Sequence, residues 1–498
     1  MRTRHKLSAA LSALLAALVI LSALASCGRE SGPTAESTGD NAGDSSAVTE
    51  PVETARLTAD VPAADYNGYT FKILTCGNWG ADWTEIYEFT ADELNGEALN
   101  DAVYTRNMAI EERFNIDINE LHHMGTTGAT GKGKDFIQRS VAAGDNAYDL
   151  VLMGTYDAAD LAAGGYLLEM NTEVPHIDLT KPWWDQKALV DLALGGRNYY
   201  ITGDITMIDN ECTFCLLFNK RLIEDYGLDD PYKHVLEGSW TIDEFVGMAS
   251  GISVDVDGDG EFTDADKYGY CIWHEAMRGM VSACGGRFCS VNSDGELELT
   301  FNTERNVNML TKFMALAYDR TTSYSIYHSP DSIEKMFAND QVLFYSRYLC
   351  IIKKYRNMET DFGILPYPKY DEIQDDYYSS VSPYGCSFIC MPTVLEDADM
   401  SGAVLESMAC ESMYTVTGAY YDITLQGKIL RDEESSEMLD IILGSRIFDL
   451  GWIYGVGNYH TELLKLFYNS SYDFASMYQK NEAAALAKIA EINETFTG

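Results

Sequence analysis

The strongest indication of the fold comes from Tyr148-Asp-Leu-Val-Leu-Met153, which is followed by Leu161-Ala-Ala-Gly-Gly-Tyr-Leu-Leu-Glu-Met170. Its first part is a short apolar run of strand length. Five similar runs lie along the chain, at 70–75, 213–218, 341–345, 361–365 and 387–391. Helical patterns stand among them, at 98–114, 135–143, 241–250, 303–318 and 400–413. Strands that alternate with helices of this length predict an α/β protein.

Two of the helices have clear starting signals. Thr241-Ile-Asp-Glu244 is a capping box, in which the Thr and Glu side chains satisfy each other's exposed backbone N–H groups. Asp331-Ser-Ile-Glu334 is a second capping box. Helices are therefore expected to begin at both positions, and Trp240, which precedes the first box, is expected in the core.

Several motifs in a fixed order resemble those of extracellular solute-binding proteins, the maltose-binding-like receptors of ABC importers. The stretch at 148–170 is the first, and Leu216-Leu-Phe-Asn-Lys220 follows, with Phe218 where the family usually has Tyr. The others are Ser239-Trp-Thr-Ile-Asp-Glu-Phe245 and the segments 336–345, 361–369 and 382–385. The resemblance covers about residues 66 to 450. It departs at Thr202-Gly-Asp-Ile205, where the family usually carries Pro.

The resemblance implies an α/β, two-lobed fold of the type II periplasmic-binding-protein kind, with lobes joined by crossing strands. We place lobe 1 at residues 66–208 and 386–445, and lobe 2 at residues 209–385 and 446–498. Crossings are expected at 208–212, at 382–386 and close to Arg446. A solute would bind in the cleft between the lobes and close the hinge, a change of shape that a transporter can read.

The N-terminus carries the marks of export. Met1-Arg-Thr-Arg-His-Lys-Leu7 is basic, and an apolar run with small residues follows, which is typical of a secretory signal over residues 1–26. Leu24-Ala25-Ser26-Cys27 resembles the lipobox of bacterial lipoproteins, in which the Cys is diacylated. We therefore expect Cys27 to anchor the protein to the outer face of the bacterial cell membrane. The alternative is an ordinary signal peptide that happens to precede a Cys.

Composition limits the partners. Residues 27–65 hold the Cys and a run of small, polar and acidic residues, which predicts a flexible acidic tether. Without the signal, 32 basic side chains remain against 77 acidic ones, a net charge near −45. Such a charge argues against nucleic acid or anionic lipid as a partner. The 32 Tyr and seven Trp residues favour a cleft that contacts its ligand through flat rings.

Ten cysteines remain besides Cys27, most of them inside apolar strand-like runs. Cys212 and Cys215 have the spacing of a metal or redox half-site, but residues three apart on a strand face opposite sides. Buried reduced thiols are the favoured interpretation. Cys284 and Cys289, around a Gly-Gly turn, are the one pair that invites a test for a disulfide.

The sharpest local motif is an acidic loop with the spacing of a calcium site. Oxygen ligands would come from Asp255, Asp257, Asp259, the backbone carbonyl of Glu261, and Asp266, with a Gly between the third and fourth. Crowded carboxylates repel one another unless a cation neutralises them. We expect a structural Ca²⁺, because the last ligand is Asp rather than the bidentate Glu of calcium sensors. An acidic turn without metal is the alternative.

A sugar needs aromatic faces for its C–H surface and carboxylates or amides for its hydroxyls. Side chains that follow strands, where open α/β sheets bind ligands, and residues at the family's cleft positions supply them. The predicted ligand residues are Trp79, Asp82, Trp83, Tyr156, Asp157, Asp204, Asp209, Tyr345, Arg347 and Tyr384, with a further contribution expected from Trp452. Packing or solvated loops are the alternative for each.

Signals for other chemistry are weak. Gly128-Ala-Thr-Gly-Lys-Gly-Lys134-Asp135 is close to a phosphate-binding loop, but Asp replaces the Ser or Thr that would bind Mg²⁺. His122-His123 lacks the spacing of a metal site, because neighbours on a strand point apart. Carboxylates are too numerous for the sequence to single out a glycosidase pair.

The sequence therefore predicts a monomeric, non-enzymatic receptor that captures an oligosaccharide or similar polyol and delivers it to an ABC permease. An extracellular glycoside hydrolase and a glycan-binding adhesin are the alternatives. Turnover of glycans would indicate the hydrolase, and neighbouring permease genes would separate the receptor from the adhesin.

Overall fold

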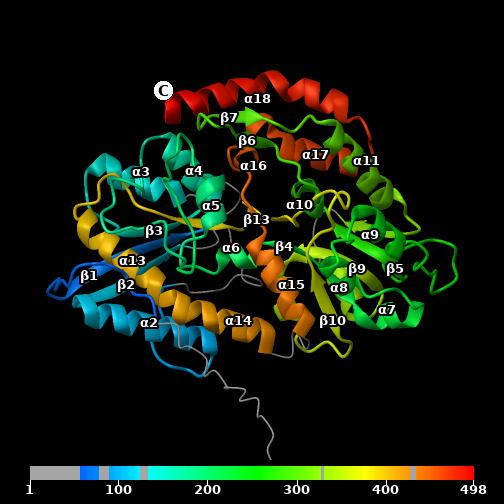
Figure 1. Cartoon of the computed structure of the whole chain (residues 1–498), viewed down its shortest axis with the longest axis horizontal. Coiled ribbons are helices and arrows are strands. Elements are labelled where there is room, and N and C mark those ends of the chain that lie inside the picture. The colour runs from blue at the N-terminus through cyan, green and yellow to red at the C-terminus, as the bar shows by residue number, and fades with distance from the viewer. Residues whose placement is uncertain (1–55, 78–88, 124–132, 327–329, 427–432) are drawn as a thin grey trace, which may run out of the picture. The chain divides into compact units, whose positions relative to one another are not determined.

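The computed structural model describes residues 56–77, 89–123, 133–326, 330–426 and 433–498. Residues 57–498 form one compact unit. Within this unit two sheets are each flanked by helices and joined by short segments (Figure 1). The predicted signal, Cys27 and most of the predicted tether lie outside the described residues. In the described ranges, each helix is too short or too polar to cross a membrane.

Lobe 1 is built on a four-stranded sheet in the order β12-β3-β1-β2. Its strands are β1 (Tyr69–Cys76), β2 (Ile116–His123), β3 (Leu150–Gly154) and β12 (Ser387–Cys390). The first three run parallel, and β12 returns antiparallel to β3. The helices of this lobe are α2 (Ala98–Phe114), α3 (Gly133–Ala143), α4 (Thr155–Ala163), α5 (Gln186–Asp191), α13 (Ala398–Tyr414) and α14 (Val416–Gln426).

Lobe 2 has a five-stranded sheet in the order β10-β4-β9-β5-β8. Its strands are β4 (Phe214–Asn219), β5 (Tyr268–Trp273), β8 (Ser323–Ile326), β9 (Val342–Tyr348) and β10 (Phe362–Leu365). The flanking helices are α7 (Lys220–Tyr226), α8 (Pro231–Leu236), α9 (Ile242–Ala249), α10 (Ala276–Ala283), α11 (Glu304–Tyr318), α12 (Asp331–Ala338) and η1 (Leu349–Tyr355). This alternation confirms the predicted mixed α/β class.

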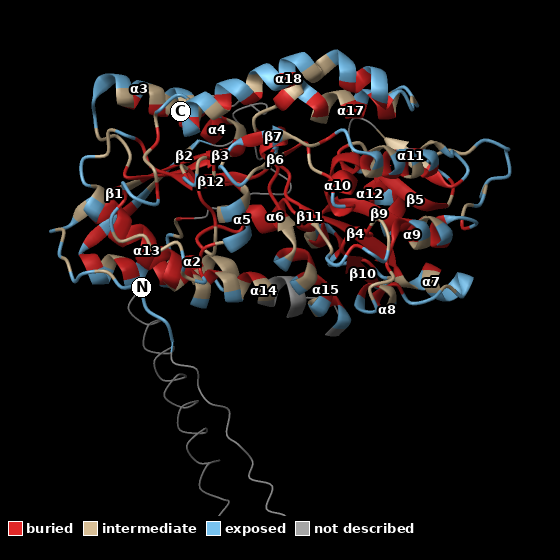
Figure 2. Cartoon of the chain, turned by 45° about the horizontal axis from the view of Figure 1, so that its top comes forward, coloured by how far each residue is buried: buried red, intermediate tan, exposed pale blue. Residues whose placement is uncertain are grey.

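The strands of both sheets form the cores of the lobes (Figure 2). Leu150 to Met153 of β3 are fully buried, and so are Leu216 and Leu217 of β4. A strand covered by helices on both faces has no polar side, which explains why 150–153 is a continuous apolar run. Trp240 is buried as predicted, and its indole N–H donates to the Pro366 carbonyl at 3.1 Å. The ten described cysteines are all buried and free of disulfides, Cys284 and Cys289 included.

Helices begin at both predicted positions. Helix α9 begins at Ile242, and the Thr241 hydroxyl accepts the Glu244 backbone N–H at 3.3 Å. Helix α12 begins at Asp331, but the residue before its first turn is Pro330 rather than the Asp331 of the predicted capping box. Proline already has the backbone angle of a helix start. The Lys354 ammonium of η1 donates a hydrogen bond to the Glu334 carboxylate at 3.0 Å.

Three short segments between the sheets lie side by side. They are α6 (Ile208–Glu211) with the residues after it, β11 (Ser379–Ser380) with the residues after it, and β13 (Arg446–Ile447). The Ser382 N–H donates to the Cys212 carbonyl at 3.0 Å, and Val381 N–H to Ile447 O at 3.0 Å. These are the positions at which crossings were expected, and the backbone bonds hold them together as one hinge.

The remaining elements border the hinge. Helix α15 (Glu433–Gly444) lies in the stretch predicted for lobe 1, yet it packs on β10 of lobe 2. A hairpin, β6 (Cys289–Val291) and β7 (Leu297–Leu299), projects from lobe 2. After β13 the chain forms α16 (Leu450–Ile453), η2 (Val456–Asn458), α17 (Tyr459–Tyr468) and α18 (Phe474–Thr497), which run across the top of Figure 1.

Candidate ligand cleft

Side chains from lobe 1, lobe 2 and the C-terminal segment meet in one cluster. We define the cleft cluster as Tyr156, Glu275, Arg278, Tyr348 and Trp452. Tyr156 stands in the first turn of α4, directly after β3. Glu275 and Arg278 stand at the start of α10, which follows β5, and Tyr348 is the last residue of β9. Trp452 comes from α16. The carboxyl ends of parallel strands are where α/β sheets bind ligands.

A polar chain runs through the lobe 2 side of the cluster. The Tyr348 hydroxyl donates to the Glu275 carboxylate and lies 3.1 Å from Ser382 Oγ of the second crossing segment. Arg278 Nη1 is 3.4 Å from Glu275 Oε1. Burial of Tyr348, followed by the negative charge of Glu275, raises the pKa of Tyr348 well above its usual range. Tyr348 therefore carries a neutral hydroxyl, which links Ser382 of the hinge to the Glu275 carboxylate.

Arg278 also joins the cluster to the C-terminal segment. Its guanidinium carbon lies 4.9 Å from the ring centre of Trp452, and its Nε donates to the His460 carbonyl at 3.0 Å. Burial, followed by the charge of Arg278, lowers the pKa of His460 to about 3. The imidazole is therefore neutral. A guanidinium over an indole face forms a favourable cation–π contact.

Tyr156 reaches this group from lobe 1. Burial raises the pKa of Tyr156, and the charges that act on its phenol are those of Arg278 and Glu275 from lobe 2. The charge of Tyr384, which is 36% exposed, also acts on this phenol. Tyr156 thus brings a hydroxyl of lobe 1 within electrostatic reach of a charged pair of lobe 2.

A second aromatic residue flanks the cluster. The Trp273 ring lies edge-on to Tyr348, with the ring centres 5.7 Å apart. Arg347 covers Trp273 at 4.5 Å from its centre, and Arg347 Nε is 3.7 Å from Glu334 Oε1. The cluster combines flat rings, a carboxylate, a guanidinium and hydroxyls. Hydroxyl-rich solutes are recognised by such a mixture, because rings meet C–H faces while charged groups bond hydroxyls.

Not all predicted ligand residues belong to this cluster. Trp79, Asp82 and Trp83 lie outside the described residues. Asp157 is buried and turns toward the start of α3, where its carboxylate accepts the Lys134 backbone N–H at 3.3 Å. Burial raises the pKa of Asp157 to about 6, against the opposing effect of Lys134.

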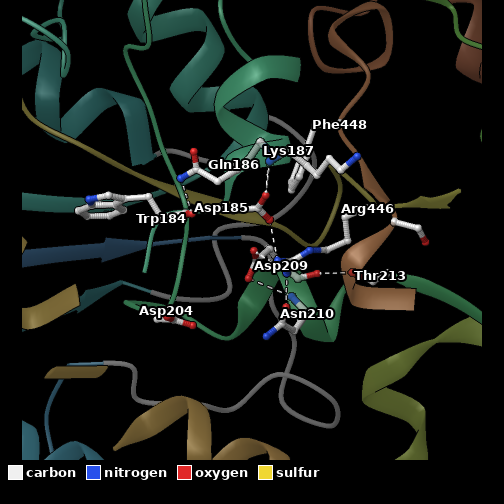
Figure 3. Close-up of polar contacts among 12 residues, drawn as sticks. Trp184, Asp185, Gln186, Lys187, Asp204, Asp209, Asn210, Thr213, Arg446 and Phe448 are labelled. Carbon is white, nitrogen blue, oxygen red and sulfur yellow. Dashed lines mark hydrogen bonds and ion pairs between the residues drawn. The ribbon is translucent and has the colours of Figure 1, made fainter. Parts of the chain in front are cut away.

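Asp204 and Asp209 lie at the hinge instead (Figure 3). The Asp204 carboxylate accepts the Thr417 hydroxyl at 2.8 Å, and burial raises its pKa to about 6. Asp209 is 1% exposed and pairs with Arg446 Nη1 at 2.9 Å. Arg446 Nη2 pairs with Asp185 at 2.6 Å, and Asn210 accepts a further bond from Nη1. Arg446 therefore joins lobe 1 to two crossing segments.

Tyr345 is fully buried in β9, where its ring packs 6.0 Å from Phe337 inside lobe 2. Its side chain thus belongs to the core of that lobe in this structure. Arg347 and Tyr384 border the cleft cluster through Trp273 and Tyr156, as described above.

Sequence reasoning missed Glu275, Arg278, Tyr348 and Trp273 as ligand candidates. The signal that points to Tyr156, a polar residue directly after a buried strand, also applies to Glu275 and Arg278. The strand that precedes them, β5, has a weak sequence signal because its second residue is Gly269. Trp452, expected to contribute, lies in the cluster.

The acidic loop has the predicted residues close together. Carboxylate oxygens of Asp255, Asp257 and Asp259 come within 4.8 Å of one another. Asp255 accepts the backbone N–H groups of Gly258 and Gly260 at 2.7 and 2.8 Å. Asp266 accepts those of Val256 and Thr263 at 2.8 and 2.7 Å, which lowers its pKa. Asp257 has a raised pKa, to which the neighbouring carboxylates contribute.

A groove of about 540 Å³ opens beside the hinge and draws on both lobes. Lys187 and Asp191 line it from α5, and Arg287 and Tyr377 line it from lobe 2. It also holds Asp375, Asp376, Asp440 and Arg446. The mixture of acids and cations favours no class of ligand, and none of the predicted ligand residues lines this groove.

Solved structures show which class of protein has this fold. A structure of M. tuberculosis UspC matches with a TM-score of 0.56 at 14% identity, covering 84% of this chain and 100% of the other. A Thermotoga lettingae solute-binding protein of an ABC transporter, bound with α-D-tagatose, matches at 0.52 with 15% identity, covering 86% and 100%. A Listeria monocytogenes ABC substrate-binding protein, in complex with cycloalternan, matches at 0.51 with 14% identity, covering 86% and 99%.

These matches confirm the predicted two-lobed fold. Residues 125–267 also match the family model of bacterial extracellular solute-binding proteins. That range includes the motifs at 148–170, 216–220 and 239–245, so the resemblance that they predict is confirmed over this part of the chain. No curated protein sequence matches the chain.

Proposed function

We propose that this protein is a receptor that captures a carbohydrate-like solute between its lobes and delivers it to an ABC permease. The observation that carries the proposal is the cleft cluster, in which the charges of Glu275 and Arg278 of lobe 2 act on Tyr156 of lobe 1, and α4 touches α16, the helix of Trp452. A solute that touches both sides stabilises the closed arrangement of the lobes. No bond is made or broken in this function.

The comparisons support the same class of solute. Two of the matched structures contain a bound carbohydrate, cycloalternan in one and α-D-tagatose in the other. The aromatic rings of Tyr156 and Trp273 suit the C–H faces of a sugar, and Glu275 suits its hydroxyls. Trp79, Asp82 and Trp83 stay proposed ligand residues on the sequence argument alone.

We also propose that Cys27 carries a lipid that keeps the receptor beside its permease, on the outer face of the cell membrane. Dual acylation suits this purpose, because one chain holds a protein at a membrane only weakly. A Cys27→Ala protein expressed in a lipoprotein-processing bacterium should appear in the medium, whereas the parent should stay with the membrane fraction. Equal partition of the two would refute the anchor.

The acidic loop is proposed to hold a structural Ca²⁺ through Asp255, Asp257, Asp259, the carbonyl of Glu261, and Asp266. Support comes from the approach of three carboxylates within 4.8 Å. Glycines at 258 and 260 allow the sharp turns that such a loop needs, with φ of +74° and +85°. The metal would neutralise like charges and hold the loop in place, away from the solute.

A thermal-shift screen against a glycan library tests the proposed function. A ligand that binds only the folded state raises the melting temperature, so at least one glycan should produce a rise. A rise with peptides or polyamines, and silence across all sugars, would refute the carbohydrate assignment. Release of free sugar from the same glycans, lost on substitution of Glu275, would instead indicate a hydrolase.

A further inference from the structure

Helix α18 spans from lobe 2 to lobe 1. Its first turns pack on lobe 2, where the Phe474 ring lies 5.1 Å from Phe301 and Tyr478 stacks on Tyr459 at 5.3 Å. Its last turn places Phe496 against Tyr199, with ring centres 5.3 Å apart. Tyr199 belongs to lobe 1, because Ile201, two residues on, exchanges backbone hydrogen bonds with Ile389 of β12.

The far end of α18 is buried rather than frayed. Phe496 is 3% exposed and Ile492 is 1% exposed, while the outer face of the helix is exposed (Figure 2). Helix ends at a chain terminus are usually poorly ordered unless something holds them. Here Asn493 fixes the end to the hairpin, because its side-chain amide accepts from Leu297 N–H at 2.8 Å and donates to Leu297 O at 3.1 Å.

The hairpin itself reaches lobe 1 next to Phe496. The Gly195 N–H of lobe 1 donates to the carbonyl of Gly295, in the β6–β7 turn, at 3.0 Å. The two backbones pass so closely that a Cβ on Gly295 would lie 2.9 Å from Gly195 Cα. A Cβ on Gly195 would lie 2.5 Å from the Phe496 carbonyl oxygen. Glycine at both positions is therefore what permits this contact between the lobes.

This contact lies outside the three hinge segments. Helix α18 also touches α4, the helix that carries Tyr156 into the cleft cluster. A movement that separates α4 from α10 must therefore break the contacts of Phe496 and Gly295 with lobe 1, or the contacts that hold α18 and the hairpin on lobe 2.

We propose that Phe496, Gly295, Gly195 and Tyr199 form a latch between the lobes. The latch holds the closed arrangement and slows the opening that releases the solute. Its role in release rests on the proposed function, whereas its effect on lobe opening does not. Ligand affinity then depends on the end of a helix that does not line the cleft.

Phe496→Ala and Phe474→Ala form a matched pair for testing the latch. Both remove a buried ring from α18, but the described ring contacts of Phe474 are with Phe301 of lobe 2 and with Tyr478 of α18 itself. Small-angle scattering of the solute-free protein should show a larger radius of gyration for Phe496→Ala and an unchanged one for Phe474→Ala. Equal radii for Phe496→Ala and the parent, or the same increase in both variants, would overturn the proposal.

Tyr199→Ala tests the same contact from lobe 1. Because Tyr199 is only half-buried, its removal should lower the stability of the protein less than Phe496→Ala does. It should raise the radius as Phe496→Ala does, and the double variant should add little, because residues in contact are not additive. Additive increases would overturn the latch. The scattering needs no solute, so its result stands even if the carbohydrate assignment fails.

With a glycan that binds, stopped-flow release should be about tenfold faster for Phe496→Ala, which corresponds to about 1.4 kcal/mol. Phe474→Ala should release at the parent's rate. Release at the parent's rate from Phe496→Ala would contradict the role of the latch in solute exchange.

Discussion

The hinge and the cleft cluster each contain an arginine with little exposure that pairs with acids, 14% for the Arg446 side chain and 8% for that of Arg278, but the two arginines are bound differently. At the hinge, Arg446 makes ion pairs of 2.6 and 2.9 Å with Asp185 and Asp209 (Figure 3). In the cleft, Arg278 lies 3.4 Å from Glu275, and its guanidinium spreads over Trp452. Attraction between charges weakens with distance. Arg446 is thus held by two acids, whereas Arg278 has one longer ion pair and a hydrogen bond to the uncharged His460 carbonyl.

Arginine and carboxylate side chains can therefore serve structure at the hinge and binding in the cleft cluster. Short pairs from three segments fix the hinge, where removal of one partner leaves the others buried without a counter-charge. A looser pair beside aromatic rings can exchange its contacts for the hydroxyls of a solute. Charge at the hinge should therefore control stability, and charge in the cleft should control affinity.

The largest effect is expected for Arg446→Met. The substitution leaves Asp185 and Asp209 buried without their cation, and the free energy of unfolding should fall by about 3–5 kcal/mol. Denaturant melts measure the change. Arg221→Met is the control, because Arg221 is 62% exposed and pairs at the surface, so it should cost no more than about 1 kcal/mol. If both variants lost the same small amount of unfolding free energy, the ion pairs of the hinge would stabilise the protein no more than a surface pair does.

The cleft variants come next. Arg278→Met and Glu275→Gln should each lower solute affinity about tenfold or more, or about 1.4 kcal/mol, while lowering stability less than Arg446→Met does. Calorimetric titration gives the affinity. Arg305→Met is the matched control, since Arg305 also covers an aromatic ring, that of Tyr370 at 4.7 Å, and donates to a carbonyl. An equal loss of affinity in Arg305→Met would mean that the effect is indirect.

A buried acid without an ion pair extends the comparison. Burial raises the pKa of Glu406 to about 7, although the Trp184 indole N–H donates to it at 3.0 Å. The folded chain therefore binds this proton more tightly than the unfolded chain, whose Glu titrates near 4.5. The cost of the buried carboxylate is present above about pH 7 and disappears as the pH falls toward 4.5.

Glu406→Gln removes this titration. Its stability relative to the parent should be higher at pH 8 than at pH 4.5, by about 1–2 kcal/mol. Chemical denaturation at several pH values measures the difference. Parallel stability curves for variant and parent across this range would show that Glu406 does not titrate as its burial implies.

The smallest effect is expected at the acidic loop. If Ca²⁺ binds the folded state, a chelator should lower the melting temperature slightly and added Ca²⁺ should restore it. Asp257→Asn should reduce this response without changing solute affinity. A melting temperature that is the same with chelator and with Ca²⁺ would argue against the site.

The sequence predicts the strands and helices well where local signals are strong. The segment predicted as a strand at 148–153 contains β3, which begins at Leu150 after the polar Asp149, and α2 begins and ends at the predicted residues. Thr241 caps α9 through its own hydroxyl. Helix α12 also begins where the box at Asp331 predicts, but Pro330 takes the capping position, and the Glu334 carboxylate accepts a hydrogen bond from Lys354.

The cleft is only partly predictable, for physical reasons. Tyr156 follows a recognisable strand, but Glu275 follows one that carries a glycine and comes after the acidic loop. Tyr345 and Tyr348 lie three residues apart on β9, so they face opposite sides of the sheet, and only Tyr348 reaches Glu275. The pairing of Asp209 with Arg446 depends on a meeting of distant segments that no local pattern encodes.

A crystal structure of the protein with the glycan that gives the largest thermal shift tests the central claim most directly. In that crystal structure we expect a sugar between Tyr156 on one side and Glu275, Arg278 and Trp273 on the other. A sugar in the groove beside Lys187 and Tyr377, or on an outer surface of either lobe, would contradict it.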